Sequence, residues 1–386
     1  MKKDIIIIGG GVVGLAAAAS LASLSLDVAV FDAKPIVKDN NPELDLRVYA
    51  INGASQALFE SLKAWPHPAG ADVLSAYRNM HVWDANSDGI LSFDAQELGL
   101  PQLGHIVEER RLKNSLLSSI DDLSKVSLHG DCQIESVDIN DESVFLQTSL
   151  GNVSAKLIIG ADGANSWLRQ ALAFNCEATP YPHHAIVCHV TTENEHNKTA
   201  YQIFHHEGPL AFLPLLEKNQ CSIVWSMPPE EAKLLMAKSD EAFKRSLTHA
   251  FQQKLGKVLT VSKRVSFPLI ERKVTPFVKP RVALMGDALH TIHPLAGLGV
   301  NLGLSDVAAL KKSMVESASD FDAFRTLRHY ERSRKAEVNA LTTLMSLLST
   351  MFSASGIPSW IRCKVMNLIS QSIFLKSRII RFAAGD

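Results

Sequence analysis

The chain has 386 residues, 46% of them apolar, and a formal net charge of −1. This length predicts two or three domains. The high apolar fraction allows a sizeable buried core and argues against an intrinsically disordered protein. The near-neutral charge argues against a nucleic-acid partner, because nucleic-acid-binding proteins present a basic surface.

The N-terminal stretch MKKDIIIIGGGVVGLAAAASLASLSL combines two lysines with a long apolar run, as signal peptides and membrane spans do. Three consecutive glycines interrupt the run, and each weakens a helix by roughly 1 kcal/mol. The pattern instead predicts a buried strand at 4–9, a tight turn, a helix at 12–25 and a second strand at 28–32, which is a βαβ unit. We therefore expect no targeting segment. Together with five cysteines that lack CxxC spacing, this predicts a cytoplasmic protein.

Gly9, Gly11 and Gly14 have G-x-G-x-x-G spacing between the first strand and the helix. In this context the glycines allow a tight turn, close approach of a pyrophosphate to the backbone, and close packing of helix on strand. Asp32 ends the second strand, where an acid can accept hydrogen bonds from ribose hydroxyls. An acid there disfavours a 2′-phosphate, so the motif predicts FAD or NAD and not NADP. The alternative is a glycine-rich turn that only packs.

Strand and helix patterns alternate along the rest of the chain. The segments NMHVWDA and GILSFDA predict an antiparallel hairpin, and not a calcium loop, because Ala95 stands where such a loop needs glutamate. Further predicted elements are a helix at 105–120, strands in 126–148, a buried strand and helix at 156–172, strands in 183–228, a helix at about 230–255, a buried strand in RVALMGDA and helices over 299–347.

Units of the parallel type thus recur at 4–32, 156–172 and 281–312, with β-rich segments between them. We predict an α/β fold in which a discontinuous Rossmann-like dinucleotide-binding domain is interleaved with an antiparallel-sheet substrate domain and followed by C-terminal helices. The predicted boundaries are 1–70, 101–172 and 270–345 for the first domain, 71–100 and 173–269 for the second, and 346–386 for the helical region.

The stretch GDALHTIHPLAGLGVNLGLSD, residues 286–306, carries four glycines and almost no charge. Asp287 follows a buried strand, at the edge where ligands of α/β sheets bind. The segment then leads into a helix whose first turn offers free N–H donors. A flat cofactor ring lying on this backbone would explain why side chains are repeatedly missing.

This stretch, together with RVYAINGASQ, EERRLKNSLL and GADGANSWLR, resembles the FAD-dependent aromatic hydroxylases, which are flavoprotein monooxygenases. The resemblance covers essentially the whole chain and is greatest for the branch that hydroxylates the polyprenylated ring in ubiquinone biosynthesis. It implies that reduced FAD reacts with O2 to form a C4a-hydroperoxide, which hydroxylates a polyprenylated phenol, with NAD(P)H as electron donor. The family often has glutamine where Leu298 stands.

The resemblance also implies the cofactor contacts. Arg47 and Arg110 would lie near the pyrophosphate or the flavin, Asp162 near the diphosphate, and Asp287 on the ribityl chain, while the backbone of residues 294–301 would cradle the isoalloxazine. The implied cofactor residues are Gly9, Gly11, Val13, Gly14, Asp32, Arg47, Arg110, Asp162, Gly286, Asp287, Pro294, Gly297, Gly299, Val300 and Asn301.

The roles of several other side chains stay open. His293 and Pro294 are the candidate catalytic residues, as backbone next to the flavin. His290 and His293 allow either a general-base role or a structural role in the loop, and we favour the structural role. Phe204, Phe212 and Pro214 are candidates for the substrate wall, with ordinary sheet core as the alternative. The histidine pairs at 183–184 and 205–206 lack neighbouring ligands, so we expect no metal.

The C-terminal tail has no acidic residue between Glu337 and Asp386. Its basic residues interrupt apolar ones, which predicts a basic amphipathic helix that either contacts an anionic membrane surface or packs on its own domain. A polyprenylated substrate would place the protein at the inner face of the membrane, with other ubiquinone-biosynthesis proteins as possible partners. Two further functions are kept as alternatives: an oxygen-independent flavin oxidoreductase of a lipid, and a non-catalytic flavoprotein subunit.

Overall fold

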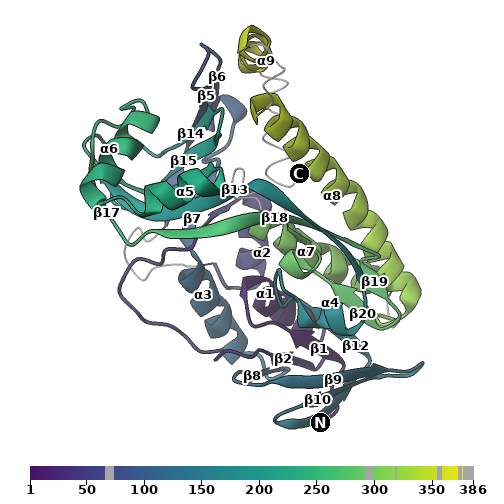
Figure 1. The fold of residues 1–386 in the computed structure, drawn as a ribbon. Helices are drawn as coiled ribbons and strands as arrows, with labels where there is room; N and C mark the ends of the chain where they lie inside the picture. Colours follow the sequence, from purple (N-terminus) through teal and green to yellow (C-terminus); the bar gives the residue numbers. More distant parts are fainter. Residues whose placement is uncertain (66–73, 292–298, 318–319, 354–358, 373–375, 377–386) are drawn as a thin grey trace.

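The computed structural model describes residues 1–65, 74–291, 299–317, 320–353, 359–372 and 376. Figure 1 shows a parallel sheet in the lower half of the view and a larger, mostly antiparallel sheet above it, with the long helix α8 (Phe324–Ser353) along one side. These two sheets confirm the predicted α/β fold with an interleaved antiparallel sheet.

The parallel sheet is built around β1 (Ile5–Ile8), whose four isoleucines are all buried. A strand covered on both faces needs a continuous apolar run, which these residues supply. The strand order is β19-β20-β12-β1-β2-β8, and β1 pairs in parallel with both β2 and β12. The other strands are β2 (Val28–Phe31), β8 (Val126–His129), β12 (Leu157–Gly160), β19 (Val278–Lys279) and β20 (Val282–Leu284).

Helix α1 (Val12–Ala22) packs on this sheet and against two other helices, α3 (Glu109–Asp121) and α7 (Gly299–Glu316). Its run of alanines at 16–19 is buried, and these small side chains let the neighbouring elements approach closely. Helix α7 also contacts α8 and α2 (Gly53–Ser61), and the short α4 (Trp167–Ala171) follows β12. The predicted βαβ unit and the predicted helices over 299–347 are therefore confirmed.

The inserted sheet has the order β21-β18-β13-β16-β15-β14-β5-β6, with β17 paired to β13. Its pairs are antiparallel except β14–β5, which is parallel. The predicted hairpin is β5–β6, so the DANSDG segment is a turn. The strands are β5 (Asn79–Asp84), β6 (Ile90–Asp94), β13 (Asn175–Thr192), β14 (Thr199–His205), β15 (Gly208–Pro214), β16 (Gln220–Met227), β17 (Val258–Val261), β18 (Val265–Thr275) and β21 (His290–Thr291).

Two three-stranded sheets complete the β-structure, with the orders β11-β10-β9 and β3-β7-β4. The proposed domain boundary at residue 270 falls inside β18, a strand of the inserted sheet. The remaining strands and 3₁₀ segments are β3 (Val48–Ile51), β4 (Ser75–Tyr77), β7 (Gly104–Glu108), β9 (Ile134–Ile139), β10 (Val144–Thr148), β11 (Gly151–Ala155), η1 (Gln96–Leu98) and η2 (Gly286–Ala288).

The helix predicted at about 230–255 is two helices, α5 (Pro229–Met236) and α6 (Asp240–Ala250). Ser239 accepts a hydrogen bond from the Ala242 N–H and so starts a new helix where one was expected to continue. Near the C-terminus, α9 (Ser359–Gln371) packs on β6. Across the described ranges, no helix has both the length and the apolar character needed to cross a membrane.

Candidate active site

A cavity of about 660 Å³ lies between the carboxyl edge of the parallel sheet and the inserted sheet. Residues that follow three parallel strands line it: Gly11 after β1, Ala161 after β12 and Asp287 after β20. The carboxyl ends of parallel strands meet at one edge of a sheet, so segments far apart in the chain converge here. The same cavity extends to the inserted sheet, where residues of β13, β14, β15, β16 and β18 form what we call its sheet floor.

The glycine motif after β1 leaves room for a ligand at one point and none at two others. Gly9 has φ +116°, and a Cβ on it would lie 2.3 Å from the Ala161 carbonyl oxygen. A Cβ on Gly14 would lie 1.9 Å from the Gly9 carbonyl oxygen. Gly11, by contrast, has open space around it, lines the cavity and begins α1 without a side-chain cap. The free N–H groups of this helix start therefore face space suited to a phosphate.

Asp32, at the end of β2, holds the glycine turn. Its Oδ2 accepts a hydrogen bond from the Gly10 N–H at 2.6 Å, and its Oδ1 accepts one from the Lys34 N–H at 2.8 Å. Each carboxylate oxygen keeps a further lone pair, so the side chain can still accept from a ribose hydroxyl. Asp32 is not among the described residues that line the cavity, so a nucleoside would lie beyond its edge.

The loop that carries Gly286 and Asp287 is fixed by a buried charge network. Asp306 is fully buried, and its Oδ2 accepts hydrogen bonds from the Gly286 N–H at 2.9 Å and from His290 Nε2 at 2.8 Å. Its Oδ1 accepts from Arg334 Nε at 2.7 Å. Burial alone would raise the pKa of Asp306, but His290 and Arg334 hold that pKa below its usual value. His290 is thus hydrogen-bonded within the network that fixes this loop.

Asp287 faces the cavity from the other side of this loop, near Arg47 and Glu109. Its carboxylate is open to the cavity but enclosed by protein on most sides, and this burial raises its pKa against the opposing effect of His290 and Arg47. Arg47 Nη1 lies 3.3 Å from Glu109 Oε2, and both residues line the cavity. The mixed charges can serve a ligand that carries both phosphates and hydroxyl groups.

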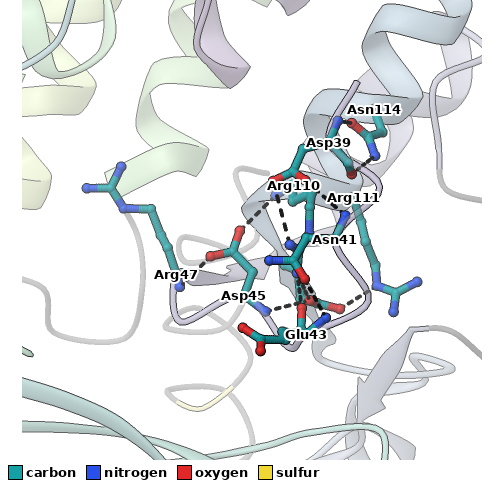
Figure 2. Close-up of polar contacts among 9 residues, drawn as sticks. Asp39, Asn41, Glu43, Asp45, Arg47, Arg110, Arg111 and Asn114 are labelled. Atoms are coloured by element: carbon teal, nitrogen blue, oxygen red, sulfur yellow. Dashed lines mark hydrogen bonds and ion pairs between the residues drawn. The ribbon is translucent and has the colours of Figure 1, made fainter. Parts of the chain in front are cut away.

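Arg110 is not among the described residues that line the cavity, and its polar contacts are with residues 39–45 and Glu108 (Figure 2). Its guanidinium donates to the Glu43 carbonyl oxygen and lies 3.4 Å from Glu108, while its backbone N–H donates to Asp45 Oδ2 at 3.1 Å. Figure 2 shows the segment formed by residues 39–47, with the Arg47 side chain at its end pointing away from Arg110. Arg110 therefore holds residues 43–47 in place, which positions Arg47 at the cavity.

The remaining predicted cofactor residues lie at or near the cavity wall. Val13, Gly299, Val300 and Asn301 line it. Asn301 is buried, donates to the Ala50 carbonyl oxygen at 2.7 Å and accepts from the Asn52 N–H at 3.1 Å, so it joins α7 to β3. Asp162 accepts from the Leu168 N–H at 3.1 Å at the start of α4, although its neighbours Ala161 and Gly163 line the cavity. His293, Pro294 and Gly297 lie outside the described residues.

The predicted substrate wall needs correction, since none of its three residues lines this cavity. Side chains alternate along a strand, and on β15 Ala211 and Leu213 face the cavity. Phe212 faces the opposite side, where its ring stacks on Phe251 with centroids 3.6 Å apart. Pro214 is two residues after Phe212 on the same strand, so it faces the same side of the sheet, away from the cavity. Phe204, on β14, packs in the main hydrophobic core beyond the cavity.

Sequence reasoning missed several cavity residues, namely Tyr49, Tyr77, Glu109, Gln202 and Ser222. Burial raises the pKa of Tyr77 to about 12, so its hydroxyl keeps its proton. Small residues in alternation, as in TAYQ and PLAFL, were the available signal for a hollowed strand face. Within the described part of the chain, no group of three histidine, cysteine or acidic side chains is placed to hold a metal.

Comparison with known proteins identifies the family. The family model described as FAD binding domain matches residues 110–344, more than half of the chain. A second model, the C-terminal domain of alanine dehydrogenase/PNT, matches residues 2–65. The Escherichia coli 3-demethoxyubiquinol 3-hydroxylase is 34% identical over 99% of this chain and 98% of its own. The human mitochondrial ubiquinone biosynthesis monooxygenase COQ6 is 31% identical over 99% of this chain and 92% of its own.

Solved structures agree on the fold. The p-nitrophenol 4-monooxygenase PnpA from Pseudomonas putida has a TM-score of 0.78 at 17% identity, covering 98% of this chain and 97% of its own. PqsL from Pseudomonas aeruginosa has a TM-score of 0.76 at 21% identity, covering 95% of this chain and 100% of its own. With the full-length sequence matches, these results show that the chain is an FAD-dependent monooxygenase and belongs to the family of ubiquinone-biosynthesis hydroxylases.

Proposed function

We propose that this chain hydroxylates the aromatic ring of a polyprenylated phenol in ubiquinone biosynthesis, with O2 as co-substrate and NAD(P)H as electron donor. The observation that carries the proposal is the single cavity that joins the start of α1, the Asp287 loop and the apolar sheet floor. A cofactor held at the first two places would face a ring held at the third. The relative whose name gives the substrate 3-demethoxyubiquinol supports this assignment.

The residues of this chain would bind and orient the two molecules. The N–H groups at Gly11 would hold the pyrophosphate, and Asp32 would accept from the ribose. The Asp287 carboxylate lines the cavity and would accept hydrogen bonds from the hydroxyls of a polyol chain. Bound FAD would supply oxygen activation, and the apolar cavity walls would exclude water from it.

We further propose that α9 contacts the membrane in which the polyprenyl chain resides. One face of α9 packs on the protein through Met366, which is 2% exposed. The other face presents Trp360 and Leu368, 59% and 64% exposed, with the Lys364 ammonium 5.1 Å from the Trp360 ring centroid. Exposed apolar side chains beside a cation suit an anionic lipid surface at the cytoplasmic side.

Co-sedimentation with anionic vesicles tests the membrane proposal. The double variant Trp360→Ala/Leu368→Ala should lose most vesicle binding. Leu234→Ala, which removes an equally exposed leucine from α5, should not. Equal binding by all three proteins would remove α9 from the account.

Isotope labelling tests the hydroxylation itself. The FAD-loaded protein, supplied with NAD(P)H, a short-chain prenylphenol and ¹⁸O2, should yield a product carrying one ¹⁸O atom. Turnover without oxygen incorporation would favour an oxygen-independent oxidoreductase. A chain that never retains FAD but restores quinone synthesis would favour a non-catalytic subunit. The precursor that accumulates after gene deletion would identify the ring position.

A further inference from the structure

The register of the inserted sheet determines which side chains form the floor of the cavity. Residues directly opposite one another on neighbouring strands share a face. One row across the sheet consists of Gln202, Ala211, Val224, Val187 and Val265, and all five line the cavity. In the next row, Leu213 is paired with Ser222, and both line it as well. In these two rows the floor is apolar except at Gln202 and Ser222.

Neither polar side chain has a hydrogen-bond partner among the described residues. Ser222 is completely buried, and its Oγ has no hydrogen-bond partner within the described residues. Gln202 is 7% exposed, and its amide makes no side-chain hydrogen bond to any residue that the structure describes. Burying polar groups without partners destabilises a protein, so such groups call for a ligand that completes their hydrogen bonds.

The ring of the proposed substrate has the complementary chemistry. Its faces and prenyl chain are apolar and match the alanine and valine side chains of the floor. Its hydroxyl and any other oxygen substituent need hydrogen bonds when water is excluded. Apolar contacts tolerate rotation of a ring in its plane, whereas directional hydrogen bonds from fixed strands do not.

We propose that Gln202 and Ser222 hydrogen-bond the oxygen substituents of the substrate ring and so determine which ring carbon is presented for hydroxylation. The phenol O–H donates to Gln202 Oε1 or Ser222 Oγ, and the Gln202 amide or the Ser222 hydroxyl donates to a second ring oxygen. Both are specificity-determining residues, and the assignment rests on the proposed function.

The first test is binding, which needs no turnover. FAD-loaded protein is titrated with a short-chain prenylphenol and with the prenylbenzene that lacks the hydroxyl, and binding is followed by flavin fluorescence. Wild type should prefer the phenol by about tenfold, the value of one or two net hydrogen bonds. Gln202→Met and Ser222→Ala should each lose most of this preference. A wild-type protein with no preference, or variants that keep it, would overturn the assignment.

The matched control is Ser226→Ala, because Ser226 is buried on the same face of β16 but does not line the cavity. It should leave the preference for the phenol unchanged. Ser222→Ala removes a hydroxyl that has no partner, so its thermal unfolding temperature should equal or exceed that of wild type. A lower unfolding temperature would show that the hydroxyl supports the fold, and this would also overturn the assignment.

The second test uses turnover and separates the two proposals. With NAD(P)H and O2, both variants should make less hydroxylated product per NAD(P)H oxidised and release more hydrogen peroxide, with FAD content unchanged. A change in the hydroxylated position would be the most direct support. If wild type hydroxylates no prenylphenol, the proposed function fails. If wild type does so and the variants match it in coupling and product, only the role of Gln202 and Ser222 fails.

Discussion

The two walls of the cavity are built in opposite ways. On the parallel-sheet side, the wall is mainly backbone: Gly11 leaves open space, and a Cβ on Gly9 or Gly14 would collide with main chain. On the inserted-sheet side, the wall consists of side chains whose direction is set by strand register. Backbone contacts suit a cofactor that is the same in every turnover, while side-chain contacts can be adapted to one substrate. Substitutions on the two sides should therefore fail in different ways.

The largest effect on stability is expected from Asp306, whose buried network fixes the loop of Gly286 and Asp287 in the backbone wall. Asp306→Ala leaves Arg334 buried without its main partner and releases the Gly286 N–H. Loss of one member of a buried ion pair should lower the free energy of unfolding by about 3–5 kcal/mol. Chemical denaturation measures this change, and a loss below about 1 kcal/mol would contradict the account of the network.

The same network predicts a pH dependence. The folded-state pKa of Asp306 is lowered, so its contribution to stability is present above the unfolded pKa of about 3.9. That contribution is lost as the pH falls through the lower folded value. Wild-type stability should therefore fall more steeply than that of Asp306→Asn on acidification below about pH 4. Parallel curves in urea denaturation would count against this assignment.

Two glycines of one motif sharpen the comparison further. Gly14→Ala places a Cβ 1.9 Å from the Gly9 carbonyl oxygen and should lower the free energy of unfolding by about 3 kcal/mol. Gly11→Ala has space for its methyl group, so apoprotein stability should change by less than about 1 kcal/mol. FAD affinity should nevertheless fall, because the methyl group occupies the place expected for the pyrophosphate. Unchanged affinity would remove Gly11 from the cofactor site.

Neighbouring residues of β15 test the side-chain wall. Phe212→Leu should lower the free energy of unfolding by about 1–1.5 kcal/mol without changing KM for the phenol, because Phe212 packs on Phe251. Leu213→Ala should raise KM with a similar loss of stability, because Leu213 lines the cavity. Thermal unfolding and steady-state kinetics separate these outcomes, and a reversed pattern would restore Phe212 as a wall residue.

The smallest effect is expected at Asp287. Its folded-state pKa is raised, so its favourable contribution is present below the unfolded pKa and is lost as the pH rises through the folded value. Asp287→Asn removes this loss, so the FAD-free variant should gain stability relative to wild type at pH 7 but not at pH 4. The measurement is thermal unfolding of both apoproteins at the two pH values, and an equal difference at both would contradict the shifted pKa.

The difference between the two walls also explains which parts of the cavity could be predicted from the sequence. The backbone wall was predictable because each glycine marks a place where a side chain is missing. The spacing of these glycines between a strand and a helix can be read from a short stretch of sequence. The side-chain wall was not, because the parity of Ala211 and Phe212 depends on pairing with strands far along the chain. Arg110 was placed near the cofactor, but its direction depends on the fold of residues 39–45. Both the sheet floor and the direction of Arg110 therefore depend on contacts between segments far apart in the chain, which a local sequence pattern does not show.

The central claim is that one cavity brings a backbone-held FAD and a side-chain-held phenol ring together. A crystal structure of the chain with FAD and a prenylphenol tests it most directly. The account predicts the pyrophosphate at Gly11, the flavin between the Asp287 loop and residues 299–301, and the phenol ring on the floor formed by Gln202, Ala211 and Ser222. A flavin outside this cavity, or a phenol bound in a separate pocket, would contradict it.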